Sequence, residues 1–123
     1  MNWVPVCPVR FLIPERGVAA LLPDGSQAAV FRTHDGGLYA LSNLDPFSGA
    51  AVLSRGIVGD RGGVATVTSP MHKQVFALAT GICLDKDDVR VPVYAVRERH
   101  GVIQLASSPR GGDFNSYAEG SSS

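Results

Sequence analysis

The sequence predicts an all-β fold, and three observations support this prediction. Short apolar or alternating runs recur along the chain, separated by Gly, Pro and Asp residues that favour turns. No segment keeps a 3.6-residue apolar period over three helical turns, so no long amphipathic helix is expected. The runs correspond to roughly nine or ten short strands, which favours an antiparallel β-sandwich or a small barrel.

The expected strands follow the chain in order. In the first part they are residues 3–7, 17–22, 27–33 and 38–42, with turns at 23–26 and 34–37. Residues 52–53 and 57–58 could form very short strands within a Gly-rich stretch. The later expected strands are residues 64–68, 74–78, 91–97 and 102–105. Residues 9–16 have room for one helical turn, because Pro8 and Pro14 limit its length.

Length and composition predict one domain followed by a tail. A chain of 123 residues matches one domain, which we place at residues 1–106. Residues 107–123 are rich in Ser and Gly, and we expect them to form a disordered C-terminal tail. Phe114 and Tyr117 are the exceptions in this tail, because an aromatic side chain could dock on a partner.

Charge and hydropathy argue against several classes of protein, although balanced charge does not exclude a local basic patch. The 11 Lys and Arg residues balance the 11 Asp and Glu residues, and no basic run indicates a nucleic-acid partner. No apolar stretch approaches the roughly 18 residues of a membrane span, and Pro and Arg interrupt the N-terminus where a signal peptide would be apolar. The expected location is therefore the cytoplasm. Cys7 and Cys83 are expected to be buried apolar residues, not a disulfide.

Two stretches in the middle of the chain carry the most specific pattern. Residues 45–50 read Asp-Pro-Phe-Ser-Gly-Ala, and residues 69–72 read Ser-Pro-Met-His, with Phe76 and Thr80-Gly81 after them. Their order and spacing resemble the two ligand loops of a Rieske iron–sulfur domain, where two Cys and two His hold the cluster. The resemblance implies a Rieske-like antiparallel β-sandwich with a small two-loop subdomain.

The ligands of such a cluster are mostly missing. The four ligand positions hold Asp45, Phe47, Ser69 and His72, and only the last matches the pattern. A phenyl ring cannot coordinate iron, and a serine hydroxyl is a much poorer ligand than a thiolate. Asp45 and His72 would supply two ligands, whereas a stable zinc site needs three or four. We therefore expect no cluster and no other metal on this chain.

The same residues also have structural interpretations. His72 could cap its loop by hydrogen bonding, and Asp45 could accept backbone N–H groups as in an ordinary turn. Phe47 could fill the volume that a cluster would occupy. Pro46 and Pro70 would stiffen the two loops. These interpretations remain open beside a role in binding a partner.

A narrower resemblance extends beyond the ligand positions. Residues 45–60 and 69–76, with Thr80-Gly81, are similar to the small subunit of cytoplasmic NAD(P)H-dependent assimilatory nitrite reductases, including the substituted ligand positions. This resemblance implies an accessory subunit with no cofactor and no catalytic residue of its own. The implied partner is a large catalytic subunit that carries FAD, a [4Fe–4S] cluster and siroheme and reduces nitrite to ammonium.

The candidate contact residues for that partner lie in and near the two loops. They are Asp45, Phe47, Arg55, Met71, His72 and Lys73. Exposed Met and Arg side chains are common at protein interfaces, although Met71 could equally fill a core. Two other functions are alternatives: a free-standing Rieske-like module that binds another partner, and a Rieske-type electron carrier. The three missing ligands argue against the carrier.

Overall fold

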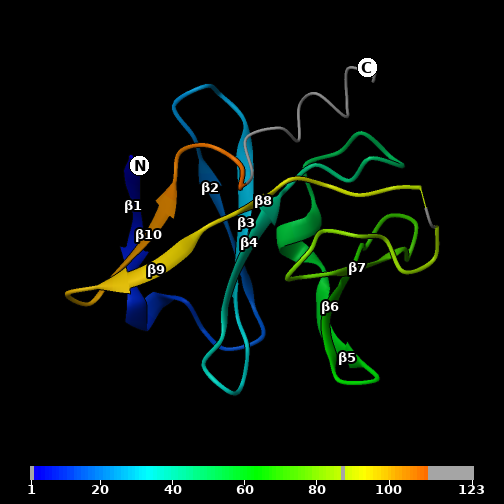
Figure 1. The fold of residues 1–123 in the computed structure, drawn as a ribbon, viewed down its shortest axis with the longest axis horizontal. Helices are drawn as coiled ribbons and strands as arrows, with labels where there is room; N and C mark the ends of the chain where they lie inside the picture. The colour runs from blue at the N-terminus through cyan, green and yellow to red at the C-terminus, as the bar shows by residue number, and fades with distance from the viewer. Residues whose placement is uncertain (1, 87, 111–123) are drawn as a thin grey trace.

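The computed structural model describes residues 2–86 and 88–110, which form three antiparallel sheets (Figure 1). The first sheet has the order β1 (Trp3–Pro8), β10 (Val102–Ala106) and β9 (Val96–Arg99). The second has the order β2 (Gly17–Leu21), β3 (Gln27–Arg32), β4 (Leu38–Ser42) and β8 (Val93–Tyr94). The third has the order β5 (Ile57–Arg61), β6 (Val64–Thr68) and β7 (Val75–Ala77). The all-β prediction is confirmed.

Two short 3₁₀ turns complete the described elements, and they correct part of the predicted boundaries. The helical turn expected within residues 9–16 is η1 (Val9–Phe11). The short strand expected at residues 52–53 is wrong, because η2 (Leu53–Arg55) occupies that place. The expected strand at residues 91–97 is divided at Ala95, because Val93 pairs with β4 while Val96 pairs with β10. The chain therefore crosses there from one sheet to another.

Strand β3 of the central sheet is buried on both of its faces. Alternate residues of a strand point to opposite faces. Ala29 and Phe31 belong to a cluster with the third sheet, whereas Ala28 and Val30 belong to a cluster with the first sheet. All four are fully buried. The continuous apolar run of this strand is thus explained by its position between two cores. In Figure 1 the central sheet stands between the other two.

The tight turn that follows β7 depends on one glycine. Gly81 has a φ of +76° and donates its N–H to the carbonyl of Ala77. A Cβ at this position would lie 2.2 Å from the carbonyl oxygen of Val91, which is far too close for any side chain. Gly81 is therefore needed both for its backbone conformation and for the close approach of residue 91.

The two cysteines are free thiols in different environments. Cys83 is buried in the cluster with Phe31 and Phe76, and Cys7 is half-buried on β1. Burial raises the pKa of the Cys7 thiol. Both side chains therefore act as small apolar residues, as expected from the sequence.

The first residues after β10 remain close to the sheets. Ser107 donates its N–H to the carbonyl of Asn2, and Arg110 donates its N–H to the carbonyl of Val93. The rest of the predicted tail, including Phe114 and Tyr117, lies outside the described residues. Within residues 2–86 and 88–110, no helix has the length and apolar character needed to cross a membrane.

Candidate functional site

The two loops singled out in the sequence are joined by a buried hydrogen bond. The Ser69 hydroxyl donates to Oδ2 of Asp45 across 2.5 Å, and both residues are fully buried. Asp45 follows β4 and Ser69 follows β6, so this bond connects the central sheet to the third sheet. The two residues stand where a Rieske pattern has its two cysteines.

Each loop is closed by the same set of hydrogen bonds around its first residue. In the first loop, Asp45 donates its N–H to Ala50 and accepts on its carbonyl from Gly49 N–H, at 2.8 and 2.7 Å. Its Oδ1 also accepts from Phe47 N–H at 2.8 Å. The prediction that Asp45 accepts a backbone N–H group is confirmed. The carboxylate therefore holds its own loop and the neighbouring one at once.

The second loop repeats this arrangement around Ser69. Ser69 donates its N–H to Gln74 and accepts on its carbonyl from Lys73 N–H, at 2.9 and 3.1 Å. Its hydroxyl oxygen also accepts from Met71 N–H at 3.2 Å. The spacing along the chain is identical to that in the first loop. Two unrelated side chains, a carboxylate and a hydroxyl, thus play equivalent parts in two equivalent turns.

The fifth residue of each turn adopts the left-handed conformation. Gly49 and Gly81 have φ values of 76°, and Lys73 has a φ of 62°. Residues 77–82 share the backbone pattern, because Ala77 donates to Ile82 and accepts from Gly81. Lys73 is the member of this set that carries a side chain, and L-residues adopt this region at a cost. The second loop is therefore the strained one.

Phe47 and His72, the other two candidate ligand positions, lie in contrasting places. Phe47 is half-buried and packs against the core, with its ring centroid 6.2 Å from that of Phe76. His72 is exposed, and its side chain makes no hydrogen bond or ion pair with any described residue. The prediction that His72 caps its loop is wrong, because Ser69 and Lys73 N–H supply those bonds.

The loops present an exposed surface that we call the two-loop surface. Leu44, just before the first loop, is 49% exposed, and Met71 in the second loop is 53% exposed. Lys73, also in the second loop, is exposed as well. Its members are Leu44, Pro46, Pro70, Met71, His72 and Lys73, all exposed. Each member lies within four residues of Asp45 or Ser69 in the sequence, and the buried bond joins those two residues. The contact expected from Asp45 itself is corrected, since its side chain is fully buried.

Arg55 belongs to a different part of the molecule. It lies in η2 and lines a separate hollow with Arg16 and Ile57.

Sequence reasoning did not identify Leu44 as part of the two-loop surface, because one leucine before the loop carries no specific signal. Sequence reasoning also did not identify the hydrogen bond between Asp45 and Ser69. The resemblance could have indicated it, because these residues occupy the positions of two cysteines that bind one iron and must therefore lie close together.

Comparison with known proteins places the chain in a family. Residues 2–106 match the model of the Rieske-like [2Fe-2S] domain. The nitrite reductase (NADH) small subunit of Escherichia coli K12 is 41% identical over 105 residues, covering 85% of this chain and 96% of that protein. This chain belongs to the nitrite reductase small-subunit family of Rieske-like domains. The fold expected from the two loops is thereby confirmed.

Two further relatives extend the comparison. A crystal structure from Mycobacterium tuberculosis, provisionally named an NADH-dependent nitrite reductase small subunit, has a TM-score of 0.82 and 58% identity. The match covers 85% of this chain and 93% of the Mycobacterium chain. The nitrite reductase [NAD(P)H] large subunit of Klebsiella oxytoca is 38% identical over 105 residues, covering 85% of this chain but 11% of that protein. In Klebsiella, a stretch similar to this small-subunit family lies inside the large chain.

The residues at the four ligand positions do not fit a [2Fe–2S] cluster. Asp45 and Ser69 bind each other, Phe47 presents only carbon, and the His72 side chain is exposed without a hydrogen-bond partner among the described residues. In the described part of the chain, no three His, Cys, Asp or Glu side chains gather in a way that could hold a metal ion. No electron-transfer step is therefore assigned to these loops.

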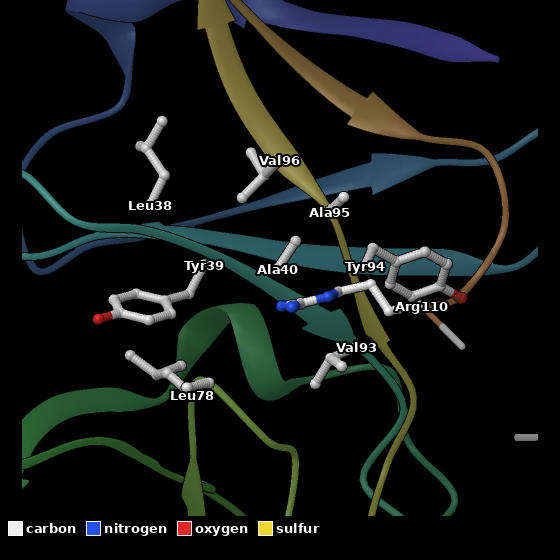
Figure 2. A pocket seen from close by; sticks show the side chains of 10 residues that line it. Leu38, Tyr39, Ala40, Leu78, Val93, Tyr94, Ala95, Val96 and Arg110 are labelled. Atoms are coloured by element: carbon white, nitrogen blue, oxygen red, sulfur yellow. The ribbon is translucent and has the colours of Figure 1, made fainter. Parts of the chain in front are cut away.

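A groove lies where the chain crosses from β8 to β9 beside β4. It has a volume of about 270 Å³ and is shown in Figure 2. Its lining residues are Leu38, Tyr39, Ala40, Leu78, Ala79, Val93, Tyr94, Ala95, Val96 and Arg110. The Arg110 side chain lies across it between Tyr39 and Tyr94 (Figure 2). Burial raises the pKa of the Tyr94 hydroxyl. The groove holds no pair of groups suited to acid–base or nucleophilic catalysis.

Proposed function

We propose that this chain is the small accessory subunit of a cytoplasmic NAD(P)H-dependent nitrite reductase. The observation that carries the proposal is the 41% identity to the Escherichia coli small subunit along 96% of that protein. By this proposal the chain supports the reduction of nitrite to ammonium during nitrate or nitrite assimilation. By the same proposal it contributes no catalytic residue of its own; among the described residues, no three His, Cys, Asp or Glu side chains gather in a way that could hold a metal ion.

The Klebsiella relative supports the choice of partner. There, a stretch similar to this chain is covalently part of a nitrite reductase large subunit. A module within the same polypeptide works at a high effective concentration beside its neighbour. A separate chain of the same family must instead bind through a surface of its own. The proposed partner is the large catalytic subunit, which would carry the FAD, the [4Fe–4S] cluster and the siroheme.

The two-loop surface is suited to that contact. Its apolar part consists of Leu44, Pro46, Pro70 and Met71, His72 adds a polar side chain, and Lys73 adds a positive charge. Protein interfaces commonly combine an apolar centre that includes Met with a polar rim. The hydrogen bonds around Asp45 and Ser69 fix the loops before binding, so little conformational entropy is lost on association. Of the earlier candidates, Met71, His72 and Lys73 belong to this surface, and the half-buried Phe47 remains a proposed contact next to Pro46.

The experiment mixes the purified chain with the purified large subunit and measures complex formation by analytical ultracentrifugation. We expect a complex, and the isolated chain should show no visible absorption from iron and sulfide. Met71→Asp places a charge on the apolar part of the surface and should weaken binding about tenfold or more. Leu21→Asp is the matched control, because Leu21 is 67% exposed on β2 and is not a member of the two-loop surface.

The outcomes separate the parts of the proposal. Absence of any complex with the large subunit would contradict the proposed function. Equal binding by Met71→Asp and Leu21→Asp would preserve the function but remove the two-loop surface as the contact. A coloured isolated chain containing iron and sulfide would contradict the conclusion that its residues do not fit a cluster.

A further inference from the structure

A second surface lies beside η2 and contains two arginines. A hollow of about 420 Å³ is formed by the start of β2, by η2 and by the start of β5. Arg16 and Arg55 line it, and each is followed directly by a glycine. Both arginines are exposed. The position therefore gathers two positive charges at one place on the surface.

The two glycines explain why the arginines come together. A Cβ on Gly17 would lie 2.3 Å from the carbonyl oxygen of Ser54, so β2 and η2 are in direct backbone contact. A Cβ on Gly56 would lie 2.5 Å from the carbonyl oxygen of Thr68, so η2 also contacts β6. Only glycine allows backbones to approach this closely. The residue before each glycine is consequently held at the edge of the same hollow.

Neither arginine has an ionic partner among the described residues. The side chains of Arg16 and Arg55 make no hydrogen bond or ion pair within residues 2–86 and 88–110. Glu15 also lines the hollow, but its carboxylate lies 3.8 Å from Nε2 of His34. Two like charges at one hollow repel each other, and a carboxylate between them would relieve the repulsion through charge-assisted hydrogen bonds.

The adjoining strand offers an open edge. β5 is an outer strand of its sheet, and in the described chain it pairs with β6 alone. Ile57, its first residue, is 71% exposed and lines the same hollow. An exposed strand edge has free backbone N–H and C=O groups that an extended segment can pair with. Here the edge begins at an apolar side chain beside two cations.

We propose that this surface binds an extended acidic segment of the nitrite reductase large subunit. A carboxylate of that segment lies between Arg16 and Arg55, an apolar side chain packs on Ile57, and its backbone pairs with β5. The partner is chosen on the proposed function, so the inference rests on it. The complementary charge and the open edge define the chemistry of the segment. This contact is separate from the two-loop surface.

The test uses the full chain and the purified large subunit. The double variant Arg16→Glu/Arg55→Glu should weaken binding about tenfold or more and reduce the salt dependence of the affinity. The control is Arg10→Glu/Arg99→Glu, which changes net charge equally at two exposed arginines outside the hollow. Thermal unfolding of both variants checks that each remains folded. Amide hydrogen exchange should also slow at residues 57–61 of the wild-type chain in the complex.

The outcomes distinguish this inference from the proposed function. Equal affinity of the two double variants, with no protection at residues 57–61, would overturn the inference while the wild-type complex upheld the function. Failure of the wild-type chain to bind the large subunit would overturn both. Weaker binding by the hollow variant alone, with protection of β5, is the expected result.

Discussion

The hydroxyl of Ser69 donates a hydrogen bond to the carboxylate of Asp45, and this bond joins two loops that are 24 residues apart in sequence. Each residue also organises the backbone of its own loop. A Rieske domain joins the corresponding loops through iron. In the described part of this chain a buried hydrogen bond makes the connection, between two residues whose side chains replace the thiolates of that pattern.

Removal of that bond should destabilise the chain. Ser69→Ala leaves Oδ2 of Asp45 buried without its donor, and we expect a loss of about 1–3 kcal/mol in the free energy of unfolding. Urea denaturation measures it. Ser48→Ala is the control, because Ser48 accepts one N–H, from Ala50, in a partly exposed part of the first loop. Equal losses in the two variants would mean that the Asp45–Ser69 bond contributes nothing special.

The two phenylalanines that meet beneath the loops should differ in their contributions. Phe76 is fully buried, and Phe76→Ala should cost about 3–5 kcal/mol. Phe47 is half-buried, and Phe47→Ala should cost roughly 1–3 kcal/mol, because part of its ring already contacts water. Chemical denaturation of both variants gives the comparison. A loss at residue 47 as large as that at residue 76 would contradict the observed exposure.

The strained conformation of Lys73 predicts a gain in stability for glycine over alanine at this position, in contrast to the losses above. Lys73→Gly should be more stable than Lys73→Ala by about 0.5–1 kcal/mol, since only glycine adopts a φ of 62° without penalty. Both variants remove the same side chain, so their difference isolates the backbone. Differential scanning calorimetry measures it. A less stable glycine variant would show that this φ carries no cost.

The close approach at Gly81 can be separated from its conformation. Gly81→Ala and Gly101→Ala both place a Cβ at positive φ, but a Cβ at Gly101 has nothing within 4 Å. The Gly81 variant would also meet the Val91 carbonyl, and we expect it to be about 2–3 kcal/mol less stable than the Gly101 variant. Thermal and urea unfolding of the two proteins test this. Similar stabilities would mean that residue 91 moves aside freely.

A hairpin turn should show a definite pH dependence. The Thr33 hydroxyl and the Gly37 N–H donate to Asp35, and these bonds lower the pKa of Asp35. A folded pKa below the unfolded value adds stability above the unfolded pKa, and this contribution disappears as pH falls through the folded pKa. NMR titration should therefore show a higher Asp35 pKa in Thr33→Ala. An unchanged pKa in that variant would contradict the assigned cause.

Much of the fold and part of the site could be predicted because they depend on local chemistry. Alternating apolar runs and Gly, Pro and Asp turns indicated most strands, and the spacing of Asp45, Ser69 and their neighbours indicated the family. The division of residues 91–97 into two strands could not be predicted, because pairing partners far away in sequence determine it. The exposure of His72 was also missed, since a motif position does not reveal which neighbour supplies the hydrogen bonds.

The sequence by itself determined the residue types at the four ligand positions, and therefore the mismatch with a cluster, because coordination depends first on which atoms a side chain carries. The loop resemblance implies that Asp45 and Ser69 lie close together, but the hydrogen bond between them, and the hollow that Arg16 and Arg55 share, are visible only in the tertiary structure. Those relationships arise from backbones brought together by sheet packing and by two glycines, and contacts between distant segments leave no local trace in the sequence.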